Sequence, residues 1–539
     1  MIGPAAKWID ATLFELARQM RWSYLPPLMV YLAYGISTIT GIVGTFFVKE
    51  YLGLSAAFLA GLAFWAGLPW ALKMPLGHLV DIIWKWKGAL VWLGAGLVAG
   101  SLGVMYQLVA APGTMAALMP IEAWYVGAML LMPCGLVLQD AVADGMSVEA
   151  VPVVDAQGAP LDEETSRALH TTMQTLGRIA LIGGTLIVSA INITVFAGVE
   201  DLPQEMKADI YARIYAIAMI VPVISVSGVM LAAWQRRRAI VRATRLGHDT
   251  APLMERPGPP TEVNPWYFIG GGAFVALSLG VGLLNVPFAQ EIVFAGSMGI
   301  VLVLMRQLMR ALDPAQARML VGTALIVFVF RAVPLPGPGA TWFVIDGLGF
   351  DAQFLSVLGM IAALLTLAAM LVLRPYMARR RLTRVYLVLT IIAGVLALPN
   401  IALYYGIQNI TAPLTFGIVD ARFIAVLDTA AESPLSQIAL IPMLAWIARN
   451  APAELKATFF AVMASFTNLA LSASSLATKY LNEIFTVTRE VTDRETGAVT
   501  VPADYSELGM LLIVAGVLTV ALPLATIWLV QRSRLRTSD

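Results

Sequence analysis

The stretch LVLQDAVADGMSVEA (136–150) ends a largely apolar run and points to the fold of the whole chain. It carries Asp140 and Asp144 four residues apart, so the two side chains share one face of a helix. A charged group inside a membrane costs several kcal/mol unless it is paired or hydrated. The stretch therefore predicts a membrane-spanning helix whose two carboxylates face the interior of a helix bundle.

The composition extends this prediction to the full length. Of the 539 residues, 59% are hydrophobic and 13% are charged, about half of the roughly 25% found in soluble domains. We expect a polytopic membrane protein embedded in a lipid bilayer. The formal net charge of +1 provides no basic field, so no nucleic-acid partner is expected.

Residues that carry metal, cofactor and hydrolytic chemistry are scarce. Cys134 is the single cysteine, and the three histidines, His78, His170 and His248, are widely separated. We expect no metal site and no bound cofactor. The chain has no Gly-x-x-x-x-Gly-Lys-Ser/Thr loop, and its spans show no serine–histidine or metal constellation. An enzyme is therefore not expected, and active transport would have to draw on an ion gradient.

Apolar stretches of about 20 residues, the length that crosses a bilayer, recur along the chain, and we predict about fourteen spans. They are Pro27–Val48, Ala56–Leu76, Ala89–Val109, Ile121–Val142, Thr171–Val195, Ile210–Trp234, Trp266–Val286, Ala289–Met305, Leu320–Ala340, Phe354–Leu373, Val385–Tyr405, Ala421–Ile447, Ala457–Leu476 and Leu508–Val530. Residues 1–25 lack the pattern of a cleavable signal peptide and predict an interfacial amphipathic helix; a short soluble helix is the alternative.

A basic and then proline-rich segment divides these spans into two sets of six. The predicted units are an N-terminal bundle at 26–234, a linker at 235–265, an inserted helix pair at 266–310, a C-terminal bundle at 311–531 and a tail at 532–539. Two six-helix bundles joined by a long linker are the arrangement of major facilitator transporters. The predicted fold class is an all-α polytopic membrane protein with a major facilitator fold and an inserted helix pair.

Basic residues collect in the loops on one side of the predicted membrane. They include Lys85, Lys87, Arg236, Arg237, Arg238, Arg242, Arg245, Arg306, Arg310, Arg318, the segment RPYMARRRLTR (374–384), Arg532, Arg534 and Arg536. Because basic loops stay in the cytoplasm, this side is predicted to be cytoplasmic and to hold both termini. We expect a bacterial inner (plasma) membrane.

Three motifs carry a family resemblance. The first lies in GLPWALKMPLGHLVD (67–81) and comprises Pro69, Trp70, Lys73, Pro75, Gly77 and Asp81. The second is the opening stretch, with Gln139, Asp140, Val142, Asp144 and Gly145. The third lies in APAELKATFFAVMASFTNLALSASS (451–475) and comprises Pro452, Glu454, Ala457, Thr458, Ala461 and Asn468.

Together these motifs resemble the folate-biopterin transporter family, whose relatives include muropeptide permeases and acetyl-CoA transporters. The chain departs from that family at Met74, which separates Lys73 from Pro75 where the family usually reads Lys-Pro. The resemblance implies a carrier that works as a monomer. It also implies that Gly77 permits close helix approach and that Asp81 caps a neighbouring helix and pairs with a base.

Charged and polar groups inside the predicted spans are the candidate site residues. Asp140 and Asp144 could relay protons or gate the carrier, and the alternative is that they anchor Arg178 or a loop. Arg178, with Gln174 one turn earlier, and Arg331 could hold a carboxylate or phosphate.

Further candidates lie in the second half of the chain. Asp428 could contact a proton or a substrate amine, Glu432 could take part in gating or proton coupling, and Asn468 could bind substrate. For Arg331, Asp428 and Glu432 a structural ion network is the alternative. Arg331 precedes the sequence AVPLPGPG, which predicts a broken helix whose freed backbone groups can face a cavity.

The predicted function is secondary active transport of an organic anion, folate- or pterin-like, by alternating access and with proton coupling. One alternative is a muropeptide or acyl-CoA carrier. Another is a transporter-like scaffold or assembly factor for a membrane complex. The substrate, the coupling ion, the direction of transport and the role of the inserted pair stay open at this point.

Overall fold

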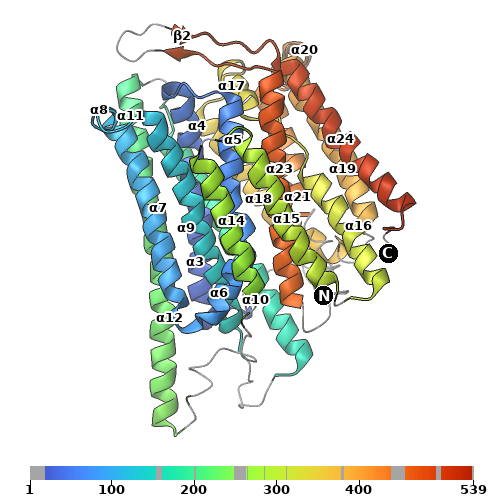
Figure 1. The fold of residues 1–539 in the computed structure, drawn as a ribbon. Helices are drawn as coiled ribbons and strands as arrows, with labels where there is room; N and C mark the ends of the chain where they lie inside the picture. The colour runs from blue at the N-terminus through green and yellow to red at the C-terminus, as the bar shows by residue number, and fades with distance from the viewer. Residues whose placement is uncertain are drawn as a thin grey trace, which may run out of the picture.

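The structure is a computed structural model that describes residues 18–152, 161–199, 202–247, 250, 263, 265–284, 286–310, 312–377, 382–438, 456–492 and 499–536. Long helices dominate this part of the chain (Figure 1), and its strands are β1 (Val491–Thr492) and β2 (Val499–Val501), an antiparallel hairpin. We call the end of the molecule that carries this hairpin the hairpin end. The opposite end, where α12 stops at Arg245, is called the linker end.

The N-terminal half is built from α3 (Leu25–Ile36), α4 (Thr40–Tyr51), α5 (Ala56–Gly67), α6 (Lys73–Ile82), α7 (Lys87–Ala110), α8 (Pro112–Ala116), α9 (Ile121–Ala150), α10 (Glu163–Val195), α11 (Gln204–Ala218) and α12 (Ile220–Arg245). Short 3-10 turns join them at η2 (Trp22–Tyr24), η3 (Ser37–Ile39), η4 (Leu68–Leu72) and η5 (Trp84–Trp86). An inserted pair follows, α14 (Pro265–Leu283) and α15 (Ala289–Met309).

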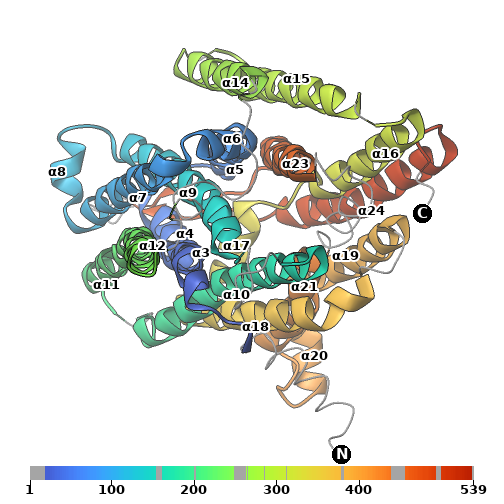
Figure 2. The ribbon, with the colours of Figure 1, turned by 90° about the horizontal axis from the view of Figure 1, so that it is seen from below.

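The C-terminal half is built from α16 (Pro314–Arg331), α17 (Pro338–Asp346), α18 (Ala352–Met377), α19 (Leu382–Tyr404), α20 (Gln408–Leu414), α21 (Ala421–Ile438), α23 (Lys456–Ile484) and α24 (Leu508–Arg532). The two halves lie side by side, and the inserted pair forms an outer layer across them (Figure 2).

Among the described residues, twelve helical segments are long and apolar enough to cross a membrane, and both helices of the inserted pair are among them. Two of the predicted spans, represented by α21 and α23, are outside this set. Helix α21 carries Arg422, Asp428 and Glu432, and residues 439–455 between the two helices are outside the described part. The major facilitator architecture is thus confirmed, while the count of about fourteen spans stays a prediction. The predicted amphipathic helix falls mostly outside the described residues.

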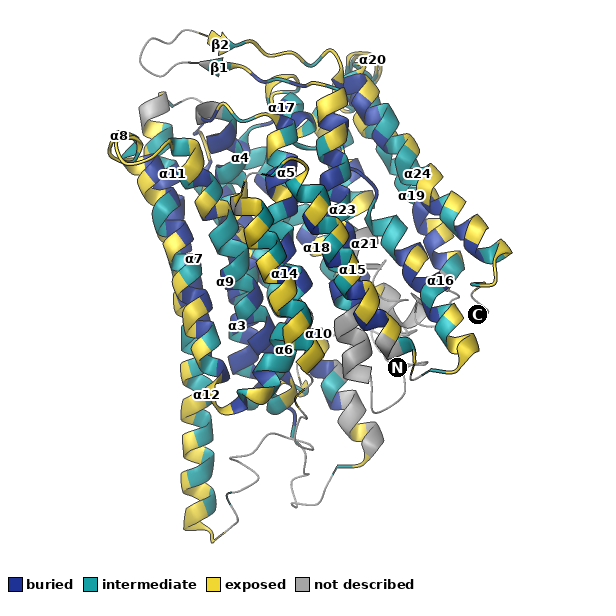
Figure 3. Cartoon of the chain, in the orientation of Figure 1, coloured by how far each residue is buried: buried dark blue, intermediate teal, exposed yellow. Residues whose placement is uncertain are grey.

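Small residues allow the helices of the N-terminal half to pack closely. A Cβ atom at Gly35 of α3 would overlap the carbonyl oxygen of Leu181 on α10. A Cβ atom at Gly94 of α7 would lie 2.5 Å from the carbonyl oxygen of Gly135 on α9. Glycine is required at both contacts because any side chain would push the helices apart. Buried side chains gather where helices face one another, and the outer faces are exposed (Figure 3).

The halves meet along two seams. At one seam α5 and α6 pack against α23, and at the other α10 packs against α18. Helix α14 contacts α6, and α15 contacts both α5 and α23, so the inserted pair covers the first seam (Figure 2).

Candidate functional site

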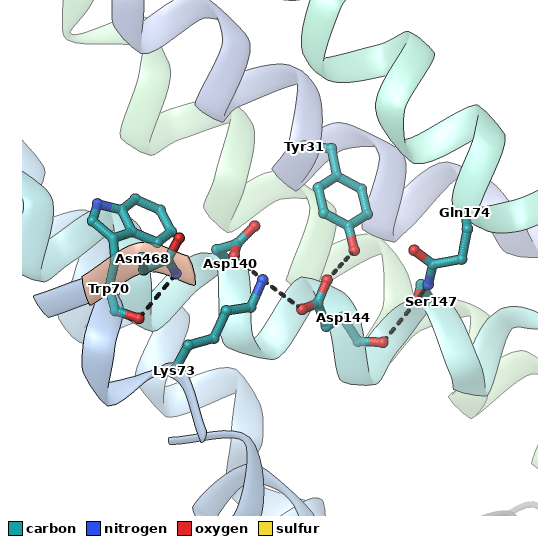
Figure 4. A network of polar contacts seen from close by, with 8 residues as sticks. All are labelled: Tyr31, Trp70, Lys73, Asp140, Asp144, Ser147, Gln174 and Asn468. Carbon is teal, nitrogen blue, oxygen red and sulfur yellow. Dashed lines mark hydrogen bonds and ion pairs between the residues drawn. The ribbon is translucent and has the colours of Figure 1, made fainter. Parts of the chain in front are cut away.

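The two aspartates of the opening stretch belong to a partly buried ionic cluster that we call the charge cluster: Tyr31, Lys73, Asp140 and Asp144 (Figure 4). Lys73 Nζ lies 2.6 Å from Asp140 Oδ2 and 2.8 Å from Asp144 Oδ2. The Tyr31 hydroxyl donates a hydrogen bond to Asp144 Oδ1 at 2.6 Å. One lysine against two aspartates leaves one net negative charge. The Asp144 side chain is 42% exposed and that of Asp140 only 11%, so Asp144 is the more accessible carboxylate.

Lys73 stands at the start of α6, directly after the 3-10 turn that interrupts the second span. Helix α5 ends at Gly67, the 3-10 turn η4 contains Pro69, and α6 begins at Lys73 itself. The turn is held from the other half of the molecule, since the Asn468 side-chain amide on α23 donates to the Trp70 carbonyl oxygen at 3.2 Å. Sequence reasoning did not include Lys73 and Tyr31 among the site residues. The available signal for Lys73 was the need of two neighbouring intramembrane carboxylates for a base.

Gln174 is joined to the charge cluster through a serine. Its side-chain amide donates to the Ser147 hydroxyl at 3.1 Å, and that hydroxyl donates to the Asp144 carbonyl oxygen at 2.7 Å (Figure 4). Ser147 thus connects α10 to the last turns of α9. Glu149, the acidic residue that ends the opening stretch, forms ion pairs with Lys87 at 2.7 Å and with Arg236. The end of α9 is therefore fixed to both α7 and α12.

Arg178 lies beside the charge cluster without belonging to it. Its charge acts on Asp140, Asp144 and Tyr34, yet it forms no hydrogen bond or ion pair with any residue in the described ranges. Its side chain is exposed. Lys73, and not Arg178, is the base that the aspartates bind, so the alternative in which they anchor Arg178 is wrong.

Arg331 brings a second guanidinium close to the first. It is the last residue of α16, and its charge and that of Arg178 interact although they belong to different halves. Its Nε atom is buried and has no hydrogen-bond partner among the described residues. The neighbouring ring of Phe330 packs on Tyr386 of α19, with ring centroids 5.0 Å apart, which fixes the end of α16.

The predicted helix break after Arg331 is present, but its backbone groups do not face open space. The Ser474 hydroxyl donates to the Val333 carbonyl oxygen at 2.5 Å, and the Leu335 amide donates to Thr478 Oγ1 at 2.9 Å. The Asn482 side chain donates to the Pro336 carbonyl oxygen at 3.1 Å. All three partners are side chains of α23, so these backbone groups are hydrogen-bonded within the protein. The expectation that the freed backbone groups face a cavity is therefore wrong for these three.

Asp428 and Glu432 lie on α21, apart from both arginines. The Asn400 side chain donates to Asp428 Oδ2 at 2.9 Å, whereas the buried Oδ1 atom has no partner in the described part of the chain. Glu432 is exposed and close enough for its charge to act on Asp428. Among the described contacts none joins either carboxylate to Arg331, so the alternative of a structural network with Arg331 finds no support there.

The remaining predicted residues lie towards the linker end of α6. A Cβ atom at Gly77 would meet no atom within 4 Å, so the close helix approach implied for this glycine is not seen. Asp81 lies one turn further along α6, at its penultimate residue. Neither residue belongs to the charge cluster.

A second polar group, at the hairpin end, was not predicted. Arg489, only 3% exposed, donates to three backbone carbonyl oxygens of the N-terminal half: Val48 at 2.7 Å, Lys49 at 2.8 Å and Leu54 at 2.8 Å. Its guanidinium also stacks on Trp342 at 4.4 Å from the ring centroid. Burial lowers the pKa of Arg489 to about 10, so the guanidinium remains charged at neutral pH.

An ion pair across the halves accompanies Arg489. Lys49 Nζ lies 2.5 Å from Asp346 Oδ1, and the Tyr505 hydroxyl donates to Asp346 Oδ2 at 2.6 Å. Burial and the neighbouring Asp346 carboxylate raise the pKa of Tyr505, which keeps its hydroxyl a donor. We call Lys49, Asp346, Arg489 and Tyr505 the latch. It joins the two halves at the hairpin end.

Solved structures share this fold along almost the whole chain. A POT family transporter in complex with a thioalcohol-conjugated peptide matches with a TM-score of 0.58 and 12% identity, over 97% of this chain and 96% of its own. A mutant form of the nucleoside transporter NupG matches with a TM-score of 0.53 and 14% identity, over 94% of this chain and 99% of its own. These likenesses and the twelve apolar helices of the described residues show the fold of a polytopic membrane protein of the major facilitator type.

Sequence comparisons give the family. The model of the BT1 family matches residues 34–538. A folate-biopterin transporter of Synechocystis sp. (strain ATCC 27184 / PCC 6803 / Kazusa) is 22% identical over 468 residues, which are 85% of this chain and 75% of the relative. The chain therefore belongs to the BT1 family, and the resemblance to folate-biopterin transporters is confirmed. The family and the structural neighbours are transporters and not enzymes.

Proposed function

We propose that the protein is a secondary active transporter of an organic anion, folate- or pterin-like, that works by alternating access and is coupled to protons. The observation that carries the proposal is the pair Arg178 and Arg331. Their charges interact across the two halves, and neither has an ion-pair partner in the described part of the chain. Arg331, whose Nε atom is buried without a partner among the described residues, bears the cost of an uncompensated charge, and an anion bound between it and Arg178 would be its partner.

The chemistry beside the arginines suits a ring that carries an acidic group. Tyr34 and Trp70 form a tilted aromatic pair with ring centroids 5.6 Å apart, next to Lys73 and Asp140. Aromatic faces stack on planar rings, and guanidinium groups bind carboxylates. A folate-biopterin transporter is among the relatives, which supports a pterin-like substrate with an anionic tail.

Proton coupling is assigned to Asp144. A proton on this accessible carboxylate would neutralise the net charge of the cluster and weaken the contact with Lys73, now 2.8 Å long. Asp140, 2.6 Å from the same amine, would keep it in place. Loading and release of a proton would therefore change how firmly α6 is held against α9.

Alternation between two states would require the latch to open, since it closes the hairpin end by joining both halves. We assign the linker end and both termini to the cytoplasm of a bacterial plasma membrane, because basic side chains gather at that end. We further propose that one copy of the chain is the working unit. Labelling of single cysteines introduced at either end, in intact cells, tests the orientation.

The test of function is uptake of labelled folate and biopterin by proteoliposomes, with and without an inward proton gradient. Wild type should accumulate substrate only with the gradient. Asp144→Asn should abolish gradient-driven accumulation while leaving exchange without a gradient. Arg213→Gln, which removes an exposed charge on α11 outside the site, is the matched control and should behave as wild type. Absence of uptake of both compounds, in vesicles shown to hold folded protein, would contradict the pterin-like substrate.

A further inference from the structure

The inserted pair α14–α15 has no counterpart in a division of the chain into two halves of six spans. It lies across the seam formed by α5, α6 and α23, and it contacts both halves (Figure 2). If the halves move relative to each other, the pair must stay with one of them and move over the other. The contacts of the pair with the C-terminal half differ from those with the N-terminal half, and this difference identifies the half with which the pair moves.

The chain itself ties the pair to the C-terminal half. Helix α15 ends at Met309 and α16 begins at Pro314, so residues 310–313 alone separate them. On the other side, residues 246–264 lie between the end of α12 and the start of α14. A link of four residues spans at most about 14 Å, which restrains α15 to the neighbourhood of α16.

Packing ties it to the same half. Val301, Leu304 and Met305 of α15 belong to the hydrophobic cluster that holds the C-terminal half together. The other buried members of this cluster come from α16, α19, α23 and α24: Leu320, Ala324, Ile326, Val327, Val385, Tyr386, Leu389, Met463, Phe466, Leu469, Ile527 and Val530. No residue of α14 or α15 belongs to the large described cluster of the N-terminal half, although Phe274 and Val293 share a smaller cluster with Phe64, Leu68 and Ala71 of α5 and η4.

A polar contact reinforces this attachment. The Glu291 carboxylate on α15 accepts a hydrogen bond from the Tyr480 hydroxyl and lies 3.6 Å from Lys479 Nζ, both on α23.

The contacts with the N-terminal half are mainly apolar and aromatic, including the rings of His78 on α6 and Tyr267 on α14, whose centroids are 5.0 Å apart. A Cβ atom at Gly271 of α14 would lie 3.1 Å from the ring of Pro75, and one at Gly282 would lie 3.3 Å from the ring of Trp65. A small apolar cavity of about 20 Å³ is lined by Ala71, Leu72 and Pro75 on one side and by residues of α14 and α15 on the other. A polar contact on this side is the Gln290 side-chain amide, which donates to the Gly61 carbonyl oxygen at 3.1 Å.

We infer that the inserted pair moves as a rigid part of the C-terminal half and slides over α5 and α6, keeping the α5–α6/α23 seam covered while the halves alternate. This inference rests on the alternating-access part of the proposed function. It assigns to the pair the role of a moving seal.

Distances between spin labels test it without any substrate. In a Cys134→Ser background, cysteines replace exposed residues on α15 (Leu302), on α24 of the C-terminal half (Leu522) and on α7 of the N-terminal half (Trp92). Labelled pairs are compared with an intact latch and with the latch weakened by Arg489→Gln. The 92–522 distance reports the movement of the halves. The inference expects the 302–522 distance to stay constant while the 302–92 distance shifts with 92–522.

The remaining outcomes overturn it in distinguishable ways. A shift of 302–522 with a constant 302–92 distance would place the pair on the N-terminal half and leave the transporter proposal intact. A constant 92–522 distance would contradict alternating access and the seal together. In uptake measurements, a Pro75→Cys/Gly271→Cys disulfide should abolish transport, whereas the matched Leu277→Cys/Gly296→Cys disulfide within the pair should leave it unchanged. Normal uptake with the first disulfide formed would also overturn the inference.

Discussion

The charge cluster of the N-terminal half differs from two charged side chains of the C-terminal half, Arg331 and Asp428, in how far its charges are paired. In the charge cluster each carboxylate meets Lys73 within 2.8 Å, and Asp144 also meets Tyr31. In the C-terminal half, Arg331 Nε and Asp428 Oδ1 are buried without a partner among the described residues. A paired charge stabilises the resting protein, whereas an unpaired one costs free energy that a ligand can recover. In the proposed function the charge cluster carries the proton, whereas Arg331 together with Arg178 contacts the substrate.

The largest expected effect is a loss of transport on substitution of Arg331, one of the unpaired groups. Arg331→Gln should lower transport by about 30-fold to several thousand-fold, because removing one partner of a buried charge pair costs about 2–5 kcal/mol. Initial rates of uptake at saturating proton gradient measure it. The thermal unfolding temperature should not fall, since Arg331 has no ion-pair partner to lose among the described residues. A clear loss of stability would show that this arginine is paired after all, and would break the comparison.

Substitution in the charge cluster, where the charges are paired, should instead lower the stability of the protein. Lys73→Met leaves two neighbouring carboxylates without their base, and breaking a buried pair costs about 3–5 kcal/mol. The exposure of Asp144, 42%, favours the lower end of that range. Thermal unfolding in detergent measures the change. The triple variant Lys73→Met/Asp140→Asn/Asp144→Asn, which removes the carboxylates as well, should regain most of the lost stability; failure to do so would argue for a packing role of Lys73.

A smaller effect is expected at the edge of the cluster. Tyr31→Phe removes the hydrogen bond to Asp144 Oδ1, which is 2.6 Å long, and should lower stability by about 1–2 kcal/mol. The same thermal measurement checks it. Tyr34→Phe is the matched control on the same helix, since no hydrogen bond of the Tyr34 hydroxyl is seen among the described residues, and it should change stability less. Equal losses in both variants would contradict the assigned hydrogen bond.

The smallest effect sharpens the contrast between the cluster and the latch. Arg489 is protonated below its pKa of about 10, so its charge does not change between pH 5.5 and 8.5, and Tyr505, whose pKa is raised, stays neutral there. A spin-label distance across the hairpin end should therefore be the same at both pH values without substrate. Any pH dependence of uptake would then originate outside the latch, and the proposed element is Asp144 of the charge cluster. A distance that changes with pH would instead indicate that the proton-sensitive element is the latch.

Much of the fold could be predicted from the sequence because the signals are local. Apolar runs of spanning length, the basic linker and the motif around Asp140 indicated the architecture and the family. Single charged residues within the spans, such as Arg178 and Arg331, were also visible as exceptions to an apolar background. Their partners were not visible, since pairing depends on how helices are turned toward each other.

Lys73 and Arg489 illustrate what the sequence could not provide. Lys73, the first residue of α6, binds two carboxylates of α9, and a sequence pattern does not show which faces of two helices meet. Arg489 binds main-chain carbonyl oxygens of residues 435 to 441 positions away in the sequence. Because every residue has such an oxygen, no sequence pattern identifies these acceptors. The break after Arg331 was predicted, but which element satisfies its backbone groups depended on α23.

The choice of acceptors at the latch has an evolutionary consequence. Because Arg489 binds main-chain oxygens, substitutions at positions 48 and 54 leave its acceptors in place. The residues at those positions of the N-terminal half can therefore be substituted during evolution without loss of these hydrogen bonds, provided the local backbone path is kept. Selection would act mainly on position 489 and on Trp342 beneath it. Relatives that diverge widely around position 48 could accordingly still close the hairpin end in the same way.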